Sequence, residues 1–316
     1  MILIRILLTS LFSVMILSGQ SPNKFIFMNG SVSPNHTPYT YDYLNDDWSD
    51  PLESFNPGGN DGCQVAYDSN NKKLIVITET NGQYYVDAYD PLTDSWESRE
   101  TLDPEHSCCE DIDESVAYDI ESDKTILCIF TNQTIYAYGY DYLTDSWTQK
   151  GSTYVGNHTH SALAYDIESD RMIYTSWVGS SSPIVTKSFD YNSNTWESKS
   201  DITFSGSISD LGMTYDSQND KIIMAILKDE YIYMNAYDYN SNSWIMTNND
   251  DSEGTRFGIT NSSDHIDLAY DPFNNIVLLI ATSQNGTTVS TYSYTLNADN
   301  LITKSLLEVS FFKWLA

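Results

Sequence analysis

The chain has 316 residues and a formal net charge of −29, because 44 Asp and Glu stand against 15 Lys and Arg. Proteins that bind nucleic acids neutralise phosphate groups with Lys and Arg, so this balance argues against a nucleic-acid partner. Adsorption to anionic lipid is disfavoured for the same reason. The acidity fits a divalent cation or a cationic partner, and a solvated acidic surface explains it equally well.

The N-terminus has the features of a secretory signal. Arg5 precedes a mostly apolar run at residues 6–17, and the small residues Ser18 and Gly19 follow it. This order predicts a signal peptide at residues 1–20 and a secreted, extracellular domain at residues 21–316. The apolar run is too short to predict a transmembrane span, so no membrane contact is expected beyond the signal segment. An uncleaved anchor is the alternative.

The chain continues as short strands bounded by Asn, Asp, Ser and Pro. Residues 25–28 and 38–42 are the first two, and Trp48 begins a third. A complete unit of four strands follows, at residues 65–68, 74–77, 84–90 and 96–98. Short apolar runs separated by such polar turns predict antiparallel neighbours in one sheet.

One eight-residue segment recurs through the chain. Residues 89–96 read Tyr-Asp-Pro-Leu-Thr-Asp-Ser-Trp. The same aromatic–Asp start and the same spacing to Trp return at residues 41–48, 140–147, 189–196 and 237–244. A repeat of about 50 residues indicates a solenoid, a propeller or an array. Since no stretch has a long amphipathic helical period, the chain is predicted to be all-β.

The number of strands suggests how the array closes. Five units begin with a strand that ends in Tyr-Asp, whereas six apolar second strands are present, because residues 25–28 lack a strand before them. If residues 306–314 supply that missing strand, the two chain ends share one blade and close a ring of six four-stranded blades without open edges. Five or seven blades are the alternatives.

The spacing from Tyr to Trp, the period and the position of His160 ahead of a strand resemble the kelch-type β-propellers, including the galactose-oxidase-like branch. The chain is divergent, because it lacks the Gly-Gly pair that this family carries after its second strands. The resemblance implies four-stranded blades, with the first strand innermost, and binding by loops around a central channel. Copper chemistry of the galactose oxidase kind is not expected, since no Cys lies in the later half of the chain.

The candidate site follows from aligning the units on the Tyr of each first strand. Five residues before that Tyr stand Gly62, Asp113, His160, Asp210 and His265. If the first strands are innermost, these side chains meet at the mouth of the channel, where Asp and His could bind a ligand or form a catalytic site. Asp113 and Asp210 could ligate a divalent cation such as calcium. The alternative is a mouth that is polar only because it is wet.

The cysteines all lie in the first half of the chain, at Cys63, Cys108, Cys109 and Cys128. Export would permit disulfides, and four cysteines allow three pairings. Cys63 and the adjacent pair Cys108 and Cys109 occupy corresponding loops of neighbouring units, so a bridge between these loops is one prediction. No Cys-x-x-Cys spacing exists, which argues against a cysteine zinc site.

Two functions fit these patterns. The first is a secreted module that binds a protein or a carbohydrate through loops at the channel mouth, with Tyr154, Trp177 and Phe257 as candidate aromatic contacts. The second is a secreted, glycan-active enzyme with a cation or a catalytic group at the same mouth. No nucleophile elbow, phosphate-binding loop or His-Glu-x-x-His motif is present, so a binding role is favoured over an enzymatic one.

Overall fold

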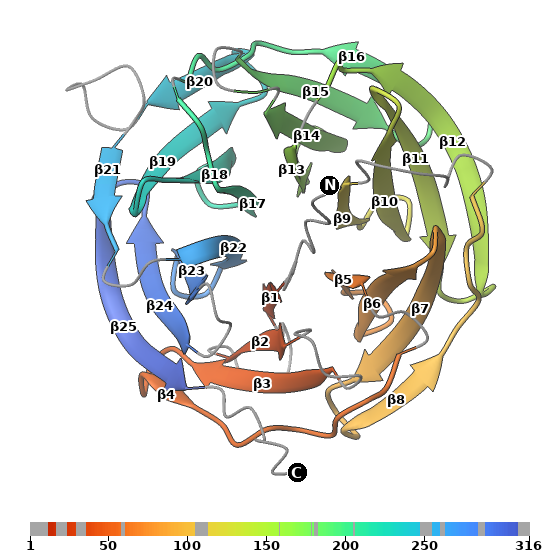
Figure 1. The fold of residues 1–316 in the computed structure, drawn as a ribbon, viewed down its shortest axis with the longest axis horizontal. Helices are drawn as coiled ribbons and strands as arrows, with labels where there is room; N and C mark the ends of the chain where they lie inside the picture. The colour runs from red at the N-terminus through yellow and green to blue at the C-terminus, as the bar shows by residue number, and fades with distance from the viewer. Residues whose placement is uncertain are drawn as a thin grey trace, which may run out of the picture.

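Six antiparallel sheets form a closed ring around a central channel in the computed structural model (Figure 1). The structure describes residues 12–16, 24–29, 36–57, 61–104, 113–157, 159–177, 179, 183–204, 206–246, 255–259, 263–283 and 288–308. The described part contains no helix long and apolar enough to cross a membrane. The predicted all-β architecture of six four-stranded blades is confirmed.

Each blade is continuous in sequence, and its strands run from the channel to the rim in chain order. The first three blades contain the strands β1 (Phe12–Ile16), β2 (Lys24–Asn29), β3 (Thr37–Asp42) and β4 (Asp47–Trp48); β5 (Asp61–Asp68), β6 (Lys73–Thr80), β7 (Gln83–Asp90) and β8 (Ser95–Ser98); β9 (Asp113–Asp119), β10 (Lys124–Thr131), β11 (Thr134–Asp141) and β12 (Ser146–Tyr154). The last three contain β13 (His160–Asp166), β14 (Arg171–Trp177), β15 (Ile184–Asp190) and β16 (Thr195–Ser198); β17 (Asp210–Asp216), β18 (Lys221–Lys228), β19 (Tyr231–Asp238) and β20 (Ser243–Met246); β22 (Ser263–Asp271), β23 (Ile276–Ser283), β24 (Thr288–Thr295) and β25 (Asn300–Glu308). An extra strand, β21 (Thr255–Gly258), pairs with β19.

The apolar core lies between the blades rather than inside any one of them. The second strand of a blade is buried on both faces, as in β18, where residues 222–227 are all buried. One face of that strand packs with blade 4 through Met224 and Ile226, and the other packs with blade 6 through Ile223 and Ala225. Continuous apolar runs are expected of strands covered on both sides, and they explain why the second strands lack alternation.

The Tyr-Asp segments form the same turn at two places in a blade. In β9, Asp119 accepts the backbone N–H of Ser122 at 2.9 Å, and the Tyr118 hydroxyl donates to Asp123 at 2.6 Å. Asp123 has a φ of 54°, a left-handed conformation that Asp and Asn tolerate better than most residues. The turn after the third strand repeats this geometry in five blades, and blade 4 has Phe189 at the Tyr position. The five pairs are Tyr41 and Asp46, Tyr89 and Asp94, Tyr140 and Asp145, Tyr237 and Asn242, and Tyr294 and Asp299.

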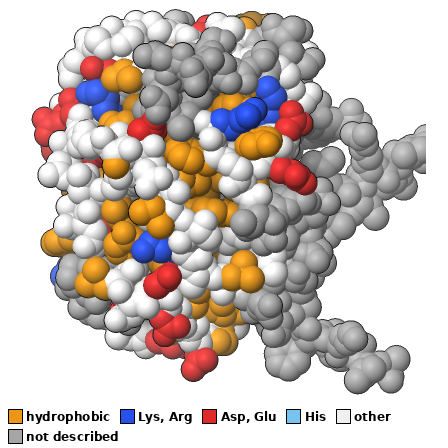
Figure 2. Space-filling model, turned by 90° about the vertical axis from the view of Figure 1, so that its left-hand side faces the viewer, with side chains coloured by type: hydrophobic (Ala, Val, Ile, Leu, Met, Phe, Trp, Pro, Cys, Tyr) orange, Lys and Arg blue, Asp and Glu red, His pale blue; other side chains and the backbone are white. Residues whose placement is uncertain are grey.

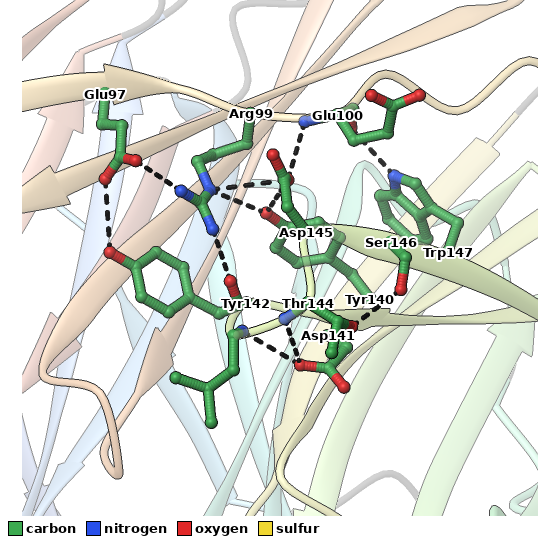
Figure 3. A network of polar contacts seen from close by, with 11 residues as sticks. Glu97, Arg99, Glu100, Tyr140, Asp141, Tyr142, Thr144, Asp145, Ser146 and Trp147 are labelled. Carbon is green, nitrogen blue, oxygen red and sulfur yellow. Dashed lines mark hydrogen bonds and ion pairs between the residues drawn. The ribbon is translucent and has the colours of Figure 1, made fainter.

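The third-strand turn also fastens each blade to the one before it (Figure 3). Asp145 of blade 3 accepts the backbone N–H of Glu100 at 2.8 Å, and Trp147 donates its indole N–H to the Glu100 carbonyl at 3.1 Å. Arg99 completes the contact, since it pairs with Asp145 at 3.5 Å and lies over the ring of Tyr142. We call this pair of hydrogen bonds, together with the Tyr hydroxyl bond, the inter-blade clasp. It recurs with the residues Glu53, Asp94 and Trp96, and Ser200, Asn242 and Trp244. Gly151, Asn194 and Trp196 form the same two seam bonds without the hydroxyl bond, because Phe189 stands in place of the Tyr.

The ring closes differently from the sequence prediction. Residues 306–308 belong to β25, the outermost strand of blade 6, and residues 309–316 lie outside the described residues. The innermost strand of blade 1 is β1, which pairs with β2 over five residue pairs. The prediction that both chain ends share one blade is therefore wrong, because the turn at Asp299 leads the chain directly into a hairpin with β24. The closing seam uses half of the clasp: Asp46 accepts the backbone N–H of Ser305 at 2.8 Å.

The side of the ring formed by the outer strands is mixed in character. Figure 2 shows separate apolar side chains among polar and charged ones on one such side. Ile302 and Leu306 of β25 are about half exposed, as are several residues at turns elsewhere. Scattered apolar side chains of this kind are normal on protein surfaces and indicate no binding patch by themselves.

Replacing the acceptor of a clasp should loosen one seam. In Asp145→Ala, the Glu100 N–H and the Tyr140 hydroxyl lose their partner, and Ala must adopt a φ of 50°. We expect a loss of roughly 2–4 kcal/mol in the free energy of unfolding, measured with urea. Asp145→Asn is the matched control, because Asn already fills this position at Asn194 and Asn242, and it should lose less than about 1 kcal/mol. Equal losses in both variants would show that the clasp does not depend on its acceptor.

A buried carboxyl group in β7 should give the protein a measurable pH dependence. Asp87 is 3% exposed, and burial raises its pKa to about 6, an effect that the Ser98 hydroxyl partly offsets. Since the folded pKa lies above the ordinary value of 3.8, protonation of Asp87 stabilises the fold at low pH, and this stabilisation is lost as pH rises through about 6. The melting temperature of Asp87→Asn relative to wild type should therefore rise between pH 4 and pH 7. A difference that stays constant between pH 4 and pH 7 would contradict the assignment.

Candidate functional site

A cavity of about 400 Å³ lies inside the ring. It is lined by the first strands of five blades, β5, β9, β13, β17 and β22, so the prediction that first strands are innermost is confirmed for these blades. A volume of this size falls in the range of sites that hold small molecules.

The two ends of the cavity differ in chemistry. At one end the strands begin with Asp113, His160 and Asp210, and Glu114 and Asp267 line the wall nearby. We call this end the acidic mouth. At the other end the strands finish with a ring of tyrosines: Tyr67, Tyr118, Tyr165, Tyr215 and Tyr270. Five residues of extended chain separate the two ends, which corresponds to about 17 Å.

Asp210 is the organising residue of the acidic mouth. Its carboxylate accepts the backbone N–H of Leu211 at 2.9 Å and that of Ile266, in the next blade, at 2.9 Å. The same carboxylate lies 3.4 Å from Nδ1 of His265 and 4.0 Å from Nδ1 of His160. The structure thus brings together three of the predicted residues, from blades 4, 5 and 6, because strands at equal register meet at one end of the ring.

The imidazole of His160 is held from two sides. Asp210 lies at its Nδ1, and the Trp177 ring stacks on it with 6.1 Å between ring centroids and an interplanar angle of 26°. A separation of 4.0 Å is longer than a hydrogen bond, so the contact between Asp210 and His160 is an electrostatic one. Nδ1 of His265 is nearer, at 3.4 Å from the same carboxylate. The cavity wall thus carries the Asp210 carboxylate and the His160 imidazole, with His265 beside them.

The other predicted positions have different outcomes. Asp113 lines the same cavity at the start of β9, and its neighbour Glu114 accepts the Tyr84 hydroxyl at 3.0 Å. Burial raises the pKa of Tyr84 well above its usual value, and the Glu114 charge is the next cause. The phenol therefore stays protonated and donates its O–H to Glu114. Gly62, the remaining predicted position, lies in β5 and has no side chain to offer a ligand.

The tyrosine end is a structural feature. Burial is the largest cause of the raised pKa of Tyr118, and Asp123 and Asp68 of the preceding blade add to it. Burial likewise raises the pKa of Tyr270 to about 12, with the charge of Asp216 in the preceding blade as the next cause. Tyr118 and Tyr270 therefore stay protonated near neutral pH. Four hydroxyls of the ring donate to the turn of their own blade, and the Tyr270 hydroxyl also accepts the backbone N–H of Gln218 across a seam, so this end serves the fold.

Metal binding and disulfides stay predictions. No group of three His, Cys, Asp or Glu side chains suited to a metal ion occurs among the residues that the structure describes. Among the described residues, Asp113 and Asp210 therefore do not form such a group with a third side chain. Cys63 and Cys128 are fully buried, and burial raises the pKa of Cys63 to about 12. Cys108 and Cys109 lie outside the described residues, so the pairing between loops is not tested.

The aromatic candidates divide by their environment. Trp177 is 6% exposed and belongs to the core between blades 4 and 5, and Phe257 packs against the core between blades 5 and 6. Only Tyr154 is exposed, with its hydroxyl on Gln133 at 2.9 Å. Sequence reasoning missed the role of Trp177 beside His160. The sequence feature that indicates this role is the position of Trp177 at the end of an apolar second strand, where it pairs directly with His160 of the first strand.

Comparison with known proteins identifies the fold but no family. No family model matches the chain, and no curated protein matches its sequence. Among solved structures, the SapL1 lectin in complex with alpha methyl fucoside is similar with a TM-score of 0.67 and 11% identity, over 95% of this chain and 97% of that one. The periplasmic gluconolactonase PpgL of Pseudomonas aeruginosa has a TM-score of 0.63 and 11% identity, over 94% and 85%. TolB from Acinetobacter baumannii has a TM-score of 0.55 and 12% identity, over 90% and 64%.

These similarities, together with the six closed sheets, define the class of the protein as a six-bladed β-propeller. Identities of this size show the fold alone. The kelch-type resemblance stays an interpretation of the Tyr and Trp spacing, since no family model supports it.

Proposed function

We propose that this propeller is a binding module whose ligand, a protein or a carbohydrate, is held at the acidic mouth of the channel. The observation that carries the proposal is the Asp210 carboxylate, which is fixed by two backbone N–H groups and lies beside both His160 and His265. Polar groups that are held in place before the ligand arrives cost little to order on binding. Carboxylate and imidazole groups suit hydroxyl, amide and ammonium groups of either ligand class.

The comparisons support a binding role in a limited way. A lectin with a bound fucoside shares the fold over almost its whole length. Because one fold hosts many unrelated functions, this likeness adds weight to a carbohydrate ligand without identifying a sugar.

A second function, a glycan-active enzyme, is favoured by the contact between Asp210 and His265. A carboxylate at Nδ1 is how an aspartate orients a histidine general base, and Asp210 lies 3.4 Å from Nδ1 of His265. A periplasmic gluconolactonase has the same fold, so the fold is compatible with an enzyme. The binding role has priority, because an aspartate and a histidine are not the two carboxyl groups at a defined separation that hydrolysis of a glycoside requires.

We also propose that the protein is exported, on the basis of the signal-like residues 1–20. The structure adds a consequence, because β1 (Phe12–Ile16) lies within this segment. Cleavage near residue 20 would leave β2 as the innermost strand of blade 1.

Binding should depend on Asp210. A screen of glycan and secreted-protein arrays with the full chain should yield a ligand whose affinity falls at least about tenfold in Asp210→Asn, the loss expected for one charged hydrogen-bonding group. Asn has a single carbonyl oxygen, so it keeps an acceptor for only one of the Leu211 and Ile266 N–H groups, and the melting curve of the variant checks that the fold persists. The control Asp50→Asn, which changes an exposed carboxylate outside the cavity, should bind as wild type does. Equal affinity in all three proteins would refute the site.

The N-terminus of the mature chain gives a separate test of export. We expect the intact mass of protein purified from a culture medium to lack about 20 residues, as a signal peptide predicts. Recovery of a secreted chain that still carries residues 1–20 would refute cleavage, and β1 (Phe12–Ile16) would then stay in blade 1, as in Figure 1.

A further inference from the structure

Blade 1 differs from the other blades in the origin of its innermost strand. β1 (Phe12–Ile16) holds this position, pairs with β2 (Lys24–Asn29), and lies next to the inner strands β22 and β5 of the neighbouring blades (Figure 1). Because β1 belongs to the residues that the proposed signal cleavage removes, the secreted chain would keep β2 without its inner neighbour. We call the place beside β2 the blade 1 slot.

The side chains of β2 are anchored in the neighbouring blades. Phe25 and Phe27 belong to the core shared with blade 6, and Ile26 and Met28 belong to the core shared with blade 2. These contacts run around the ring, whereas β1 pairs with β2 along its edge. Loss of β1 would therefore open the backbone N–H and C=O groups at one edge of β2, and an open edge is a template for another strand.

The inner strands of blades 2 to 6 are joined by tyrosine–aspartate contacts at the tyrosine end. In four tyrosines burial is the largest cause of a raised pKa, and the carboxylate that ends the preceding inner strand adds to it. The pairs are Tyr118 and Asp68, Tyr165 and Asp119, Tyr215 and Asp166, and Tyr270 and Asp216. All four carboxylates are at most 2% exposed. Each of these seams thus places the Tyr of one inner strand beside the terminal Asp of the inner strand before it.

Strand register shows which residue of β1 stands at the tyrosine position. In blade 3, Thr125 of the second strand pairs with Tyr140 of the third, and in blade 1 Phe25 pairs with Tyr41 in the same way. Tyr140 and Tyr41 both donate to the acidic residue five positions later. Phe25 is therefore the counterpart of Thr125.

β1 carries neither residue of the contact. On the inner side Thr125 pairs with Tyr118, whereas Phe25 pairs with Ile16. The next residue in the sequence is Leu17, where the five other inner strands end in Asp. Isoleucine has no hydroxyl to donate, and leucine has no carboxylate to accept. The sequence of β1 therefore lacks the pattern that the five other inner strands share.

The two seams beside the blade 1 slot retain their half of the pattern. Asp271, which ends β22 in blade 6, is 1% exposed, and Tyr67 of β5 packs against the core between blades 1 and 2. A strand in the slot that ends in Tyr-Asp would place its hydroxyl at Asp271 and its carboxylate at Tyr67, as in the other seams. Nine Tyr-Asp pairs occur in residues 21–316, and all of them lie in strands of the six blades. The strand that fits the slot is therefore not among these residues.

We propose that the blade 1 slot binds an extended segment of a partner protein, which adds to β2 as an antiparallel strand and carries Tyr-Asp at the tyrosine end of the channel. The inference rests on the proposed function, because the slot opens only if residues 1–20 are removed, and it names a protein as a ligand of the channel. The segment runs from the acidic mouth toward the tyrosine end, as the other inner strands do. Its backbone pairs with β2, and its tyrosine donates to Asp271.

A peptide copied from this chain tests the proposal. The probe is Ser-Ala-Leu-Ala-Tyr-Asp, the sequence of residues 161–166 in β13, with fluorescein at its N-terminus. Protein secreted into a culture medium, with its N-terminus near residue 21 shown by intact mass, should bind the probe saturably in fluorescence anisotropy. The same chain made without export keeps β1 in the slot and should bind at least about tenfold more weakly. No saturable binding to the cleaved chain, or equal binding to both chains, would overturn the slot.

Peptide variants separate strand pairing from adsorption to an apolar surface. A Tyr→Phe peptide lacks the hydroxyl that reaches Asp271, so its affinity should fall about fivefold to tenfold. Backbone N–H groups point alternately to the two edges of a strand, so proline at one of two neighbouring positions, the Leu or the Ala after it, must remove a bond to β2. At least one of these two proline peptides should lose binding. Parent affinity in both proline peptides would overturn the strand, and parent affinity in the Tyr→Phe peptide would overturn the contact with Asp271.

Hydrogen exchange locates the bound peptide. In the cleaved chain the amides of residues 25–28 that face the slot should exchange at least about tenfold faster than in the uncleaved chain, and the peptide should restore their protection. The amides of β18, which lies on the other side of the ring, serve as the control and should not change. Peptide binding that leaves β2 exchange unchanged would overturn the slot.

The outcomes separate this inference from the proposed function. If the secreted protein retains residues 1–20, signal cleavage and the slot fail together, and binding at Asp210 is judged by its own test. If the chain is cleaved but does not bind the peptide, this inference fails and the proposed function stands.

Discussion

The structure depends on one contact that is repeated between neighbouring blades. A single residue after the fourth strand gives its N–H to the turn of the next blade and its carbonyl to the Trp of that blade. In blade 3 the Tyr140 hydroxyl donates to the same acceptor, the Asp145 carboxylate. Asp145 has a left-handed backbone conformation, which Asp and Asn tolerate better than most residues. Each seam thus satisfies backbone groups that a sheet edge would otherwise leave open.

This contact explains why the site can lie on strand ends rather than on long loops. The clasps and the tyrosine ring fix the turns at one face of the ring, and the first strands then deliver Asp113, His160 and Asp210 to the opposite end in equal register. Asp210 adds a bond to blade 6 through Ile266. A carboxylate placed by several blades is pre-organised, which suits binding at little cost in conformational entropy.

Most of the fold and part of the candidate site could be predicted from the sequence. The Tyr and Trp spacing predicts repeated blades, and the count of apolar second strands predicts six of them. Alignment on the first-strand Tyr predicts that His160, Asp210 and His265 meet, because register is a local property. The closing blade was predicted wrongly, since pairing between distant segments leaves no local pattern in the sequence, and residues 300–308 pair with β24 in blade 6. The stacking of Trp177 on His160 was not predicted, because it depends on where the second strand ends, and strand boundaries are the least certain part of a sequence prediction.

The histidines allow the most direct test of the central claim, that the acidic mouth is where this protein binds. Only five are present, and His36 is buried in blade 1, away from the cavity-lining strands. NMR of the imidazole signals, assigned with single His→Gln variants, would be followed while a ligand from the glycan and protein screen is added. The account predicts that the signals of His160 and His265 shift together with saturation while that of His36 stays in place. Saturable binding that leaves both mouth signals unchanged would contradict it.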